Sequence, residues 1–176
     1  SPLCVEYALS NGFEIVNDIT ALANDDIARI VAKYDATVVL MHMQGEPSMM
    51  QHEPSYENVI LEVDAFFEER IEKAKRFGIK KIVLDVGIGF GKSLEHNLTL
   101  LKHHEHFLHF GYPLLVGASR KSMIDKIISS PISERLAGSL ALHLKAYEHG
   151  ATILRVHDVK AHVQALSVLR ALNLTV

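Results

Sequence analysis

The segment VLDVGIGFGKS, residues 83–93, contains the pattern that decides the fold of this chain. An apolar run, Ile82 to Leu84, ends on the carboxylate of Asp85, and a glycine-rich loop then leads into the helical pattern LEHNLTLL. The closing Gly-Lys-Ser resembles a phosphate loop, but that motif needs a glycine where this chain has Val86. The dinucleotide fingerprint also fails, because Lys92 stands at its third glycine. The segment therefore predicts a buried strand, a loop and a helix, with an acidic group at the end of the strand.

Four other segments have the same form, a short apolar run followed by polar residues and then a helical pattern. The five predicted strands are FEIVN (13–17), TVVLM (37–41), KIVLD (81–85), PLLVG (113–117) and TILRV (152–156). Runs that are apolar nearly throughout are typical of strands buried on both faces. Between them, apolar residues recur at spacings of three and four, as in amphipathic helices. We predict an α/β fold of parallel βα units, either an open doubly wound sheet or part of a barrel.

Composition limits the classes of protein to which the chain belongs. With 176 residues, of which 48% are hydrophobic, it has material for one core, and we expect a single domain over residues 1–176. The net charge of −3 gives no general attraction to nucleic acid, and no apolar run is long enough to span a membrane. One cysteine excludes an internal disulfide. We expect a soluble cytoplasmic protein without nucleic acid or membrane partners.

Polar groups follow every predicted strand. The segments after the strands begin ND at Asn17, MHMQG at Met41, DVGIGFG at Asp85, GASRKS at Gly117 and RVHD at Arg155. In parallel α/β folds the carboxyl ends of the strands meet at one edge, where ligands bind. The pattern predicts one shared site at that edge.

The residue types at this edge have ordinary structural roles as well as functional ones. Asn17 suits a turn as well as a ligand contact, and Met41 and Phe90 are typical of core positions by spacing alone. For Asp85 we favour a ligand role, because a glycine loop separates it from the next helix and Ser93 is the better cap.

Cations are the other group at this edge. SRKS places two of them, Arg120 and Lys121, directly after a strand, either as a solvated pair or as part of an anion pocket. Arg155 and His157 are two apart on a predicted strand, so we expect them to face the same side and to suit a phosphate or diphosphate. The inventory predicts a binding site for a polar heterocycle and an anion, with no visible nucleophile.

A second group of candidate ligands lies in KHHEHFLHFG, where four histidines crowd one predicted helix: His103, His104, His106 and His109. As metal ligands they would need a shared face and supporting contacts. An exposed polar face is the ordinary interpretation of such a helix, and we predict that these histidines lie on the surface.

Taken together, these motifs resemble the dihydropteroate synthase family. The matching segments, in the family's order across essentially the whole chain, are IVNDI, LMHMQGEPSMMQ, LDVGIGFGKS, LLVGASRKSMI, SERLAGSLA and RVHDV. The resemblance implies a TIM barrel that joins a dihydropterin diphosphate to p-aminobenzoate and releases diphosphate with the help of Mg²⁺. It further implies a homodimer of the full-length enzyme and sensitivity of the family to sulfonamides.

The resemblance also assigns roles to residues. Asn17, Asp85 and Lys121 would hold the pterin ring, with Met41, Gly89 and Phe90 bordering its pocket; Ser119 would contact the aminobenzoate region; Arg155 and His157 would contact the diphosphate; and Gly117 would belong to the substrate-binding loop. Lys121, Arg155 and His157 are the residues we expect to act in catalysis.

Two departures from the family pattern qualify these expectations. Val86 stands where the family usually has proline. The family's N-terminal loops, one of which would hold the Mg²⁺ ligand, have no counterpart, so we expect the chain to supply strands four to eight of the barrel and to be catalytically silent alone. The alternatives are a pterin-dependent methyltransferase, which would have little use for a diphosphate clamp, and a silent fragment that retains weak ligand binding.

Overall fold

The computed structural model describes residues 1–45 and 54–174. Part of the motif LMHMQGEPSMMQ, residues 46–51, lies outside the described residues. None of the described helices is long and apolar enough to cross a membrane.

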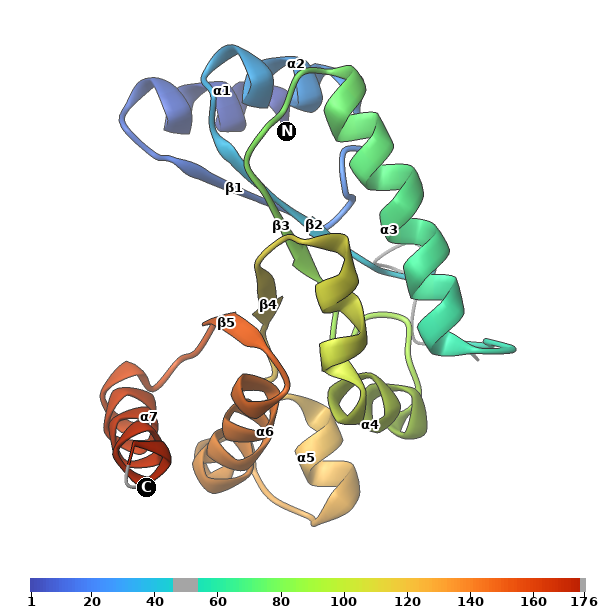
Figure 1. Ribbon diagram of the computed structural model, residues 1–176. Helices are drawn as coiled ribbons and strands as arrows, with labels where there is room; N and C mark the ends of the chain where they lie inside the picture. Colours follow the sequence, from blue (N-terminus) through green and yellow to red (C-terminus); the bar gives the residue numbers. More distant parts are fainter. Residues whose placement is uncertain (46–53, 175–176) are drawn as a thin grey trace.

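The sheet has five parallel strands in chain order, with helices between them (Figure 1). The strands are β1 (Ile15–Asp18), β2 (Thr37–Met41), β3 (Ile82–Asp85), β4 (Leu114–Val116) and β5 (Ala151–Leu154). The α-helices are α1 (Pro2–Ser10), α2 (Asp25–Lys33), α3 (Val59–Arg76), α4 (Leu94–Lys102), α5 (Ser122–Ile127), α6 (Leu136–Glu148) and α7 (Val159–Asn173). Two 3₁₀ helices, η1 (His104–Phe110) and η2 (Ile132–Glu134), complete the elements. This order confirms the predicted α/β fold, and it is the order of consecutive units in a (β/α)₈ barrel.

Alternation along each strand separates two faces of the sheet. On one face Leu40, Leu84 and Val116 belong to the main core, together with Phe67 of α3 and Leu100 of α4. In Figure 1, α3, α4 and α6 lie on this side of the sheet. Burying the apolar stripes of these helices against the strands provides most of the favourable free energy of folding.

The opposite face of the sheet carries a smaller apolar cluster. Val39, Val83 and Leu115 pack together there, while Ile15 on β1 is 59% exposed and Ile153 on β5 is 36% exposed. The exposed pair lies on the two outer strands of the sheet. The uncovered face continues at its carboxyl end into the candidate site.

Helix ends follow the capping rules. Ser93 begins α4 with a capping box in which its side chain accepts the His96 backbone N–H, as predicted. Asn24 and Asn58 cap α2 and α3 in a similar way. Gly78 and Gly111, which follow α3 and η1, have positive φ angles of 80° and 74°, the left-handed conformation that ends a helix.

Two predictions about local structure were wrong. The histidine-rich segment forms the 3₁₀ helix η1, and His104 within it is fully buried while its neighbours are exposed. The predicted strand TILRV is shorter, because β5 ends at Leu154 and Arg155 and His157 lie beyond it. A register shift between Leu114 and Leu115 precedes this early end of the β4–β5 ladder.

Candidate functional site

Strand register brings several predicted residues to one level of the sheet. Met41 pairs with Asp85, and Asp85 pairs with Leu115 on the next strand. The backbone N–H of Arg155 donates to the Val116 carbonyl at 2.9 Å, so the ladder continues one residue past β5. The carboxyl ends of β2 to β5 therefore converge, as the strand-end pattern predicted.

Asp85 is the most deeply buried acid at this edge, with 2% of its surface exposed. One carboxylate oxygen accepts the Gly87 backbone N–H at 2.8 Å. Burial raises the pKa of Asp85, while the Gly87 hydrogen bond and the charges of Arg155, Lys92 and Lys121 oppose the rise. The carboxylate thus sits at a desolvated position among cations, where it can accept hydrogen bonds from a ligand.

The glycine-rich loop after Asp85 is held against the loop after β2. A Cβ at Gly87, whose φ is +69°, would lie 1.9 Å from the His42 carbonyl oxygen, so only glycine fits this close approach. Lys92 holds the loop in place, because its Nζ donates to the carbonyls of His42 at 3.3 Å, Gly87 at 3.1 Å and Phe90 at 2.9 Å.

Burial lowers the pKa of this lysine to about 7. The sequence analysis assigned no role to Lys92, although the Gly-Lys-Ser ending indicated that this lysine follows a tight loop. Lys92 donates to backbone carbonyls of the protein, whereas the lysine of a phosphate loop binds phosphate.

The side chain of Lys121 packs against Phe90 and Gly89. The Lys121 ammonium lies 4.2 Å from the centroid of the Phe90 ring, a cation–π contact. A Cβ at Gly89 would lie 3.3 Å from Lys121 Cδ, so the glycine lets the lysine stem pass closely. Burial first, and then the charge of Arg155, lowers the pKa of Lys121.

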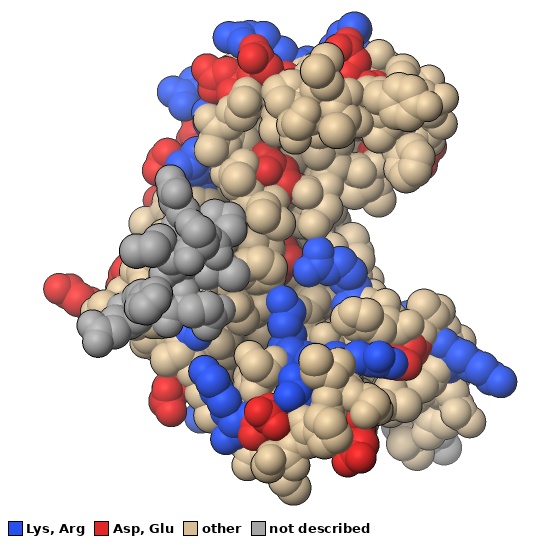
Figure 2. All heavy atoms as spheres, turned by 180° about the vertical axis from the view of Figure 1, so that it is seen from behind, with Lys and Arg blue, Asp and Glu red and all other residues tan. Residues whose placement is uncertain are grey.

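A cavity of about 310 Å³ adjoins this lysine. Its lining residues are Gly117, Ser119, Lys121, Arg155, Val156 and His157. Figure 2 shows that Lys and Arg side chains gather near a notch in the outline of the molecule and on the part below it. The cavity is therefore suited to an anion, and it contains every predicted member of the diphosphate clamp.

Contacts within this cavity orient its polar groups. A Cβ at Gly117 would lie 3.1 Å from Arg155 Nε, so the absence of a side chain there makes room for the guanidinium. Ser119 Oγ accepts the His157 backbone N–H at 3.2 Å and lies 2.9 Å from His157 Nδ1. If the serine hydroxyl donates to Nδ1, the neutral ring keeps its proton on Nε2, where it is a donor for an anion.

Of the two consecutive cations, only one lines the cavity. Arg120 donates to both carboxylate oxygens of Asp158, at 3.1 Å from Nε and 2.7 Å from Nη2. Its φ of +57° is in the left-handed region, and this turn points the two side chains differently. Arg120 therefore ties two strand-end loops together while Lys121 serves the cavity, a division that the sequence pattern did not reveal.

Two buried histidines that the sequence interpretation missed support the same loops. The Ala118 N–H donates to His143 Nε2 at 3.0 Å, and His143 Nδ1 lies 2.8 Å from His162 Nε2. His162 Nδ1 lies 2.9 Å from the Asp158 carbonyl, so each ring donates from Nδ1 and accepts at Nε2. Burial and the second histidine lower the pKa of His143 to about 4, which keeps the His143 ring neutral.

Five predicted site residues do not line the basic cavity: Asp85, Gly89 and Phe90, which interact with its cations, and Asn17 and Met41. Asn17 is exposed on the edge strand β1, paired in register with Val39, while its neighbour Asp18 is buried and caps the turn after β1. Met41 is fully buried and lines a separate cavity of about 350 Å³ with Phe66 and other residues. Among the residues described, Asn17 and Met41 do not line the basic cavity.

Comparison with known proteins identifies the family. The model of the family described as "Pterin binding enzyme" matches residues 2–157. The chain belongs to the pterin binding enzyme family.

Named members of the pterin binding enzyme family resemble this chain closely. It is 45% identical over 172 residues to the dihydropteroate synthase of Escherichia coli K12, covering 97% of this chain and 61% of that protein. It is 42% identical to the bifunctional dihydropteroate synthase/dihydropteroate reductase of Helicobacter pylori, covering 97% of this chain and 45% of that protein. The chain thus spans roughly half to three fifths of the length of these relatives.

Solved structures of the family agree with the fold. Dihydropteroate synthase from Thermus thermophilus in complex with 6HMPPP matches with a TM-score of 0.95 at 40% identity, over 98% of this chain and 70% of that chain. The same enzyme in complex with 4-aminobenzoate matches with a TM-score of 0.94, over 98% of this chain and 71% of that chain.

Proposed function

We propose that the protein is a dihydropteroate synthase, which joins a dihydropterin diphosphate to p-aminobenzoate. The observation that carries the proposal is the position of a buried carboxylate, Asp85, next to a cavity lined by Lys121, Arg155 and His157. Relatives named dihydropteroate synthase, and a structural neighbour solved with 4-aminobenzoate, support the choice of substrates. A pterin-dependent methyltransferase would have little use for such a cationic cavity, so the cavity favours the synthase.

In the proposed reaction the amine nitrogen of p-aminobenzoate forms a bond to the exocyclic methylene carbon of the pterin. The bond from that carbon to the diphosphate oxygen breaks, and the amine proton leaves to solvent. Asp85 accepts hydrogen bonds from N–H groups of the pterin ring. Lys121, whose ammonium lies over the Phe90 ring, helps to hold the pterin. Arg155 and His157 stabilise the charge that develops on the diphosphate. No protein nucleophile is needed, because the site acts by positioning and charge stabilisation.

Mg²⁺ belongs to this proposal as a companion of the diphosphate. The side chains that line the described cavity, those of Ser119, Lys121, Arg155, Val156 and His157, are not the oxygen-rich ligand set that Mg²⁺ prefers. A homodimer and a cytoplasmic location are further parts of the proposal, and light scattering of the purified protein tests the first.

Asp85→Asn tests whether Asp85 accepts hydrogen bonds from the pterin ring. The amide keeps the shape of the side chain but loses the charge, so affinity for a pterin without phosphates should fall by about 1.5 to 3 kcal/mol. The exposed carboxylate Glu134 provides the matched control, since Glu134→Gln should leave affinity unchanged. Unchanged pterin affinity in Asp85→Asn by calorimetry contradicts the role.

The anion role is tested by Arg155→Ala, with Lys160→Ala as a control cation on α7. Arg155→Ala should weaken binding of the pterin diphosphate far more than binding of the pterin without phosphates. An equal loss for both ligands indicates a structural arginine instead. Formation of dihydropteroate from both substrates tests the reaction itself, and binding without product supports the silent-fragment alternative.

A further inference from the structure

Three metal-ligating side chains converge on the helix-covered side of the molecule. Asp64 lies near the beginning of α3, and His106 and His109 lie on η1. His106 Nε2 is 2.7 Å from one Asp64 carboxylate oxygen, and His109 Nε2 is 3.9 Å from the other. One ligand atom from each of the three residues lies within 4.8 Å of the others. The geometry thus brings two imidazoles and a carboxylate from segments about 42 residues apart into one cluster.

The hydrogen bonds of His109 leave a lone pair facing the carboxylate. His109 Nδ1 lies 2.7 Å from the His106 backbone carbonyl, which only accepts, so Nδ1 carries the proton. In the neutral ring, Nε2 is then an acceptor, and it faces Asp64 Oδ1. That oxygen is buried and has no hydrogen-bond partner among the residues described.

Two acceptors that face each other across 3.9 Å at a partly buried position leave room for a donor or a metal ion between them. A backbone carbonyl that fixes the tautomer from the opposite side of the ring is also the usual support of a metal-binding histidine. The contact between His109 Nδ1 and the His106 carbonyl is therefore the supporting contact that a metal-binding histidine needs and that the sequence alone could not show.

Aromatic packing holds η1 against α3 without the help of a bound ion. Phe67 of α3 meets Phe107 edge-to-face with ring centroids 5.8 Å apart, and it meets Phe110 at 5.9 Å. Phe67 and Phe107 are both fully buried, and His106 and His109 pack against Phe107 and Phe110 respectively, so the two histidines stand on a rigid base.

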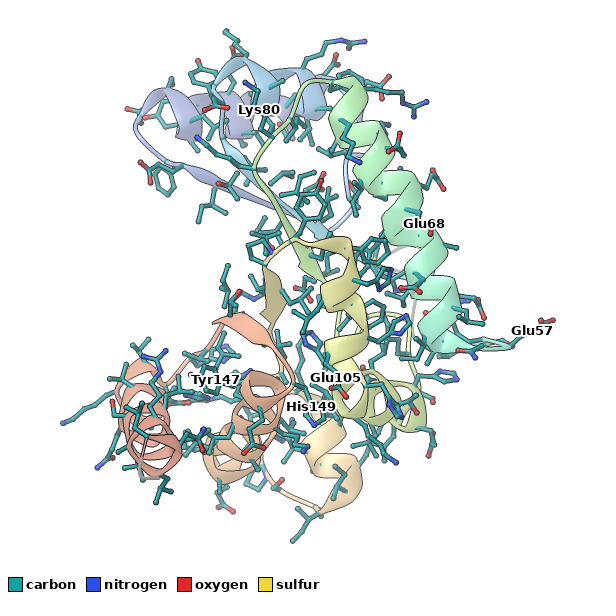
Figure 3. All side chains as sticks on the ribbon, in the orientation of Figure 1. Glu57, Glu68, Lys80, Glu105, Tyr147 and His149 are labelled. Carbon is teal, nitrogen blue, oxygen red and sulfur yellow. The ribbon has the colours of Figure 1, made fainter. Side chains whose placement is uncertain are left out.

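The other side of η1 is anchored as well. Figure 3 shows Glu105 and His149 close together, and these side chains contact each other, which joins η1 to the residue that follows α6. The cluster is preorganised in the sense that binding an ion needs only side-chain adjustment.

We propose that Asp64, His106 and His109 form a binding site for a divalent transition-metal ion, with Zn²⁺ as the best match. Two imidazoles and one carboxylate are a ligand set that suits Zn²⁺ and is poor for Mg²⁺ or Ca²⁺, which prefer oxygen. With bonds of about 2.0 Å in a tetrahedral site, neighbouring ligand atoms lie about 3.3 Å apart. The three ligand atoms already lie within 4.8 Å of one another, so small side-chain shifts bring them to that spacing.

Such an ion joins α3 to η1, on the side of the sheet opposite the small cluster of Val39, Val83 and Leu115. Its role is to stabilise the packing of the outer helices, and it is separate from the Mg²⁺ of the proposed reaction. Binding of a pterin ligand should therefore be the same with and without Zn²⁺.

The test uses protein purified without a histidine tag and stripped of metal by a chelator. Titration with Zn²⁺ by calorimetry should give one site per chain, and Co²⁺ should give the visible absorption of a tetrahedral ion. Asp64→Asn and His109→Ala should each weaken binding at least about tenfold. His103→Ala is the matched control, because His103 is an exposed histidine next to η1 that does not belong to the cluster.

A second measurement separates loss of ligand from loss of fold. Circular dichroism should show each variant folded, and Zn²⁺ should raise the thermal midpoint of the unmodified protein and of His103→Ala but not of Asp64→Asn or His109→Ala. Absence of Zn²⁺ binding at micromolar concentrations overturns the proposal, and so does equal binding in the unmodified protein and His109→Ala. Either result reduces the cluster to surface hydrogen bonding without an ion.

Discussion

The buried histidine relay predicts a defined loss of stability at mildly acidic pH. His143 is fully buried, accepts the Ala118 N–H and contacts His162, so a proton on either ring breaks a hydrogen bond in the relay. Burial lowers the pKa of His143 from 6.5 to about 4. Between these values the unfolded chain binds a proton that the folded chain does not, so this contribution is fully present above pH 6.5 and is lost as the pH falls toward 4.

The size of the effect follows from the two pKa values. At pH 5.5 about nine tenths of the unfolded imidazole is protonated and almost none of the folded one, which lowers the free energy of unfolding by about 1.4 kcal/mol relative to pH 7.5. The full loss is roughly 3 kcal/mol, and it is reached only below pH 4. Other groups, such as Asp85 with its raised pKa, change the total dependence on pH, so the measurement must isolate His143.

His143→Gln isolates this contribution, because the glutamine amide offers both an acceptor and N–H donors for the relay but does not titrate. Urea unfolding at pH 7.5 and 5.5 should show that the unmodified protein loses about 1.4 kcal/mol more than His143→Gln over this interval. The exposed histidine His103 provides the control, since His103→Gln should keep the dependence of the unmodified protein. If His143→Gln and the unmodified protein lose equal stability, His143 titrates alike in both states and the reasoning fails.

Two further predictions concern the loop that follows Asp85. Gly87→Ala should be about 1 to 3 kcal/mol more destabilising than Gly78→Ala in urea unfolding, because a Cβ at Gly87 meets the His42 carbonyl whereas none is met at Gly78; equal losses would show that the loop yields freely. Lys92→Met should lower the free energy of unfolding by about 2 to 4 kcal/mol, since three carbonyls lose their donor. A loss below about 1 kcal/mol would mean that water replaces the ammonium.

Much of the fold was predictable because its signals are local. Each strand is a short apolar run, and each predicted strand overlaps an observed one. Ser93 caps α4 as expected because capping depends on residues within one turn. The ends of β4 and β5 were less predictable, since the register shift at Leu114 and Leu115 arises from the pairing of two strands distant in sequence.

The candidate site was predictable in composition and less so in detail. The clustering of Lys121, Arg155 and His157 follows from parallel topology, which brings strand ends together whatever their separation in the chain. The roles of all the predicted site residues toward substrates stay predictions. The separation of Arg120 from Lys121 depends on the left-handed backbone of Arg120, which residue type did not indicate.

The sequence by itself determined the alternation of βα units, the carboxylate before a glycine loop and the polar groups at the strand ends. These depend on residue order within a few positions, where sterics and hydrogen bonding act directly. Tertiary structure alone decided which groups are buried and which partners they meet. It sets Lys92 on three carbonyls, gives Arg120 to Asp158, and brings Asp64 to the histidines of η1. Burial and partners arise from packing between distant segments, so no local pattern encodes them.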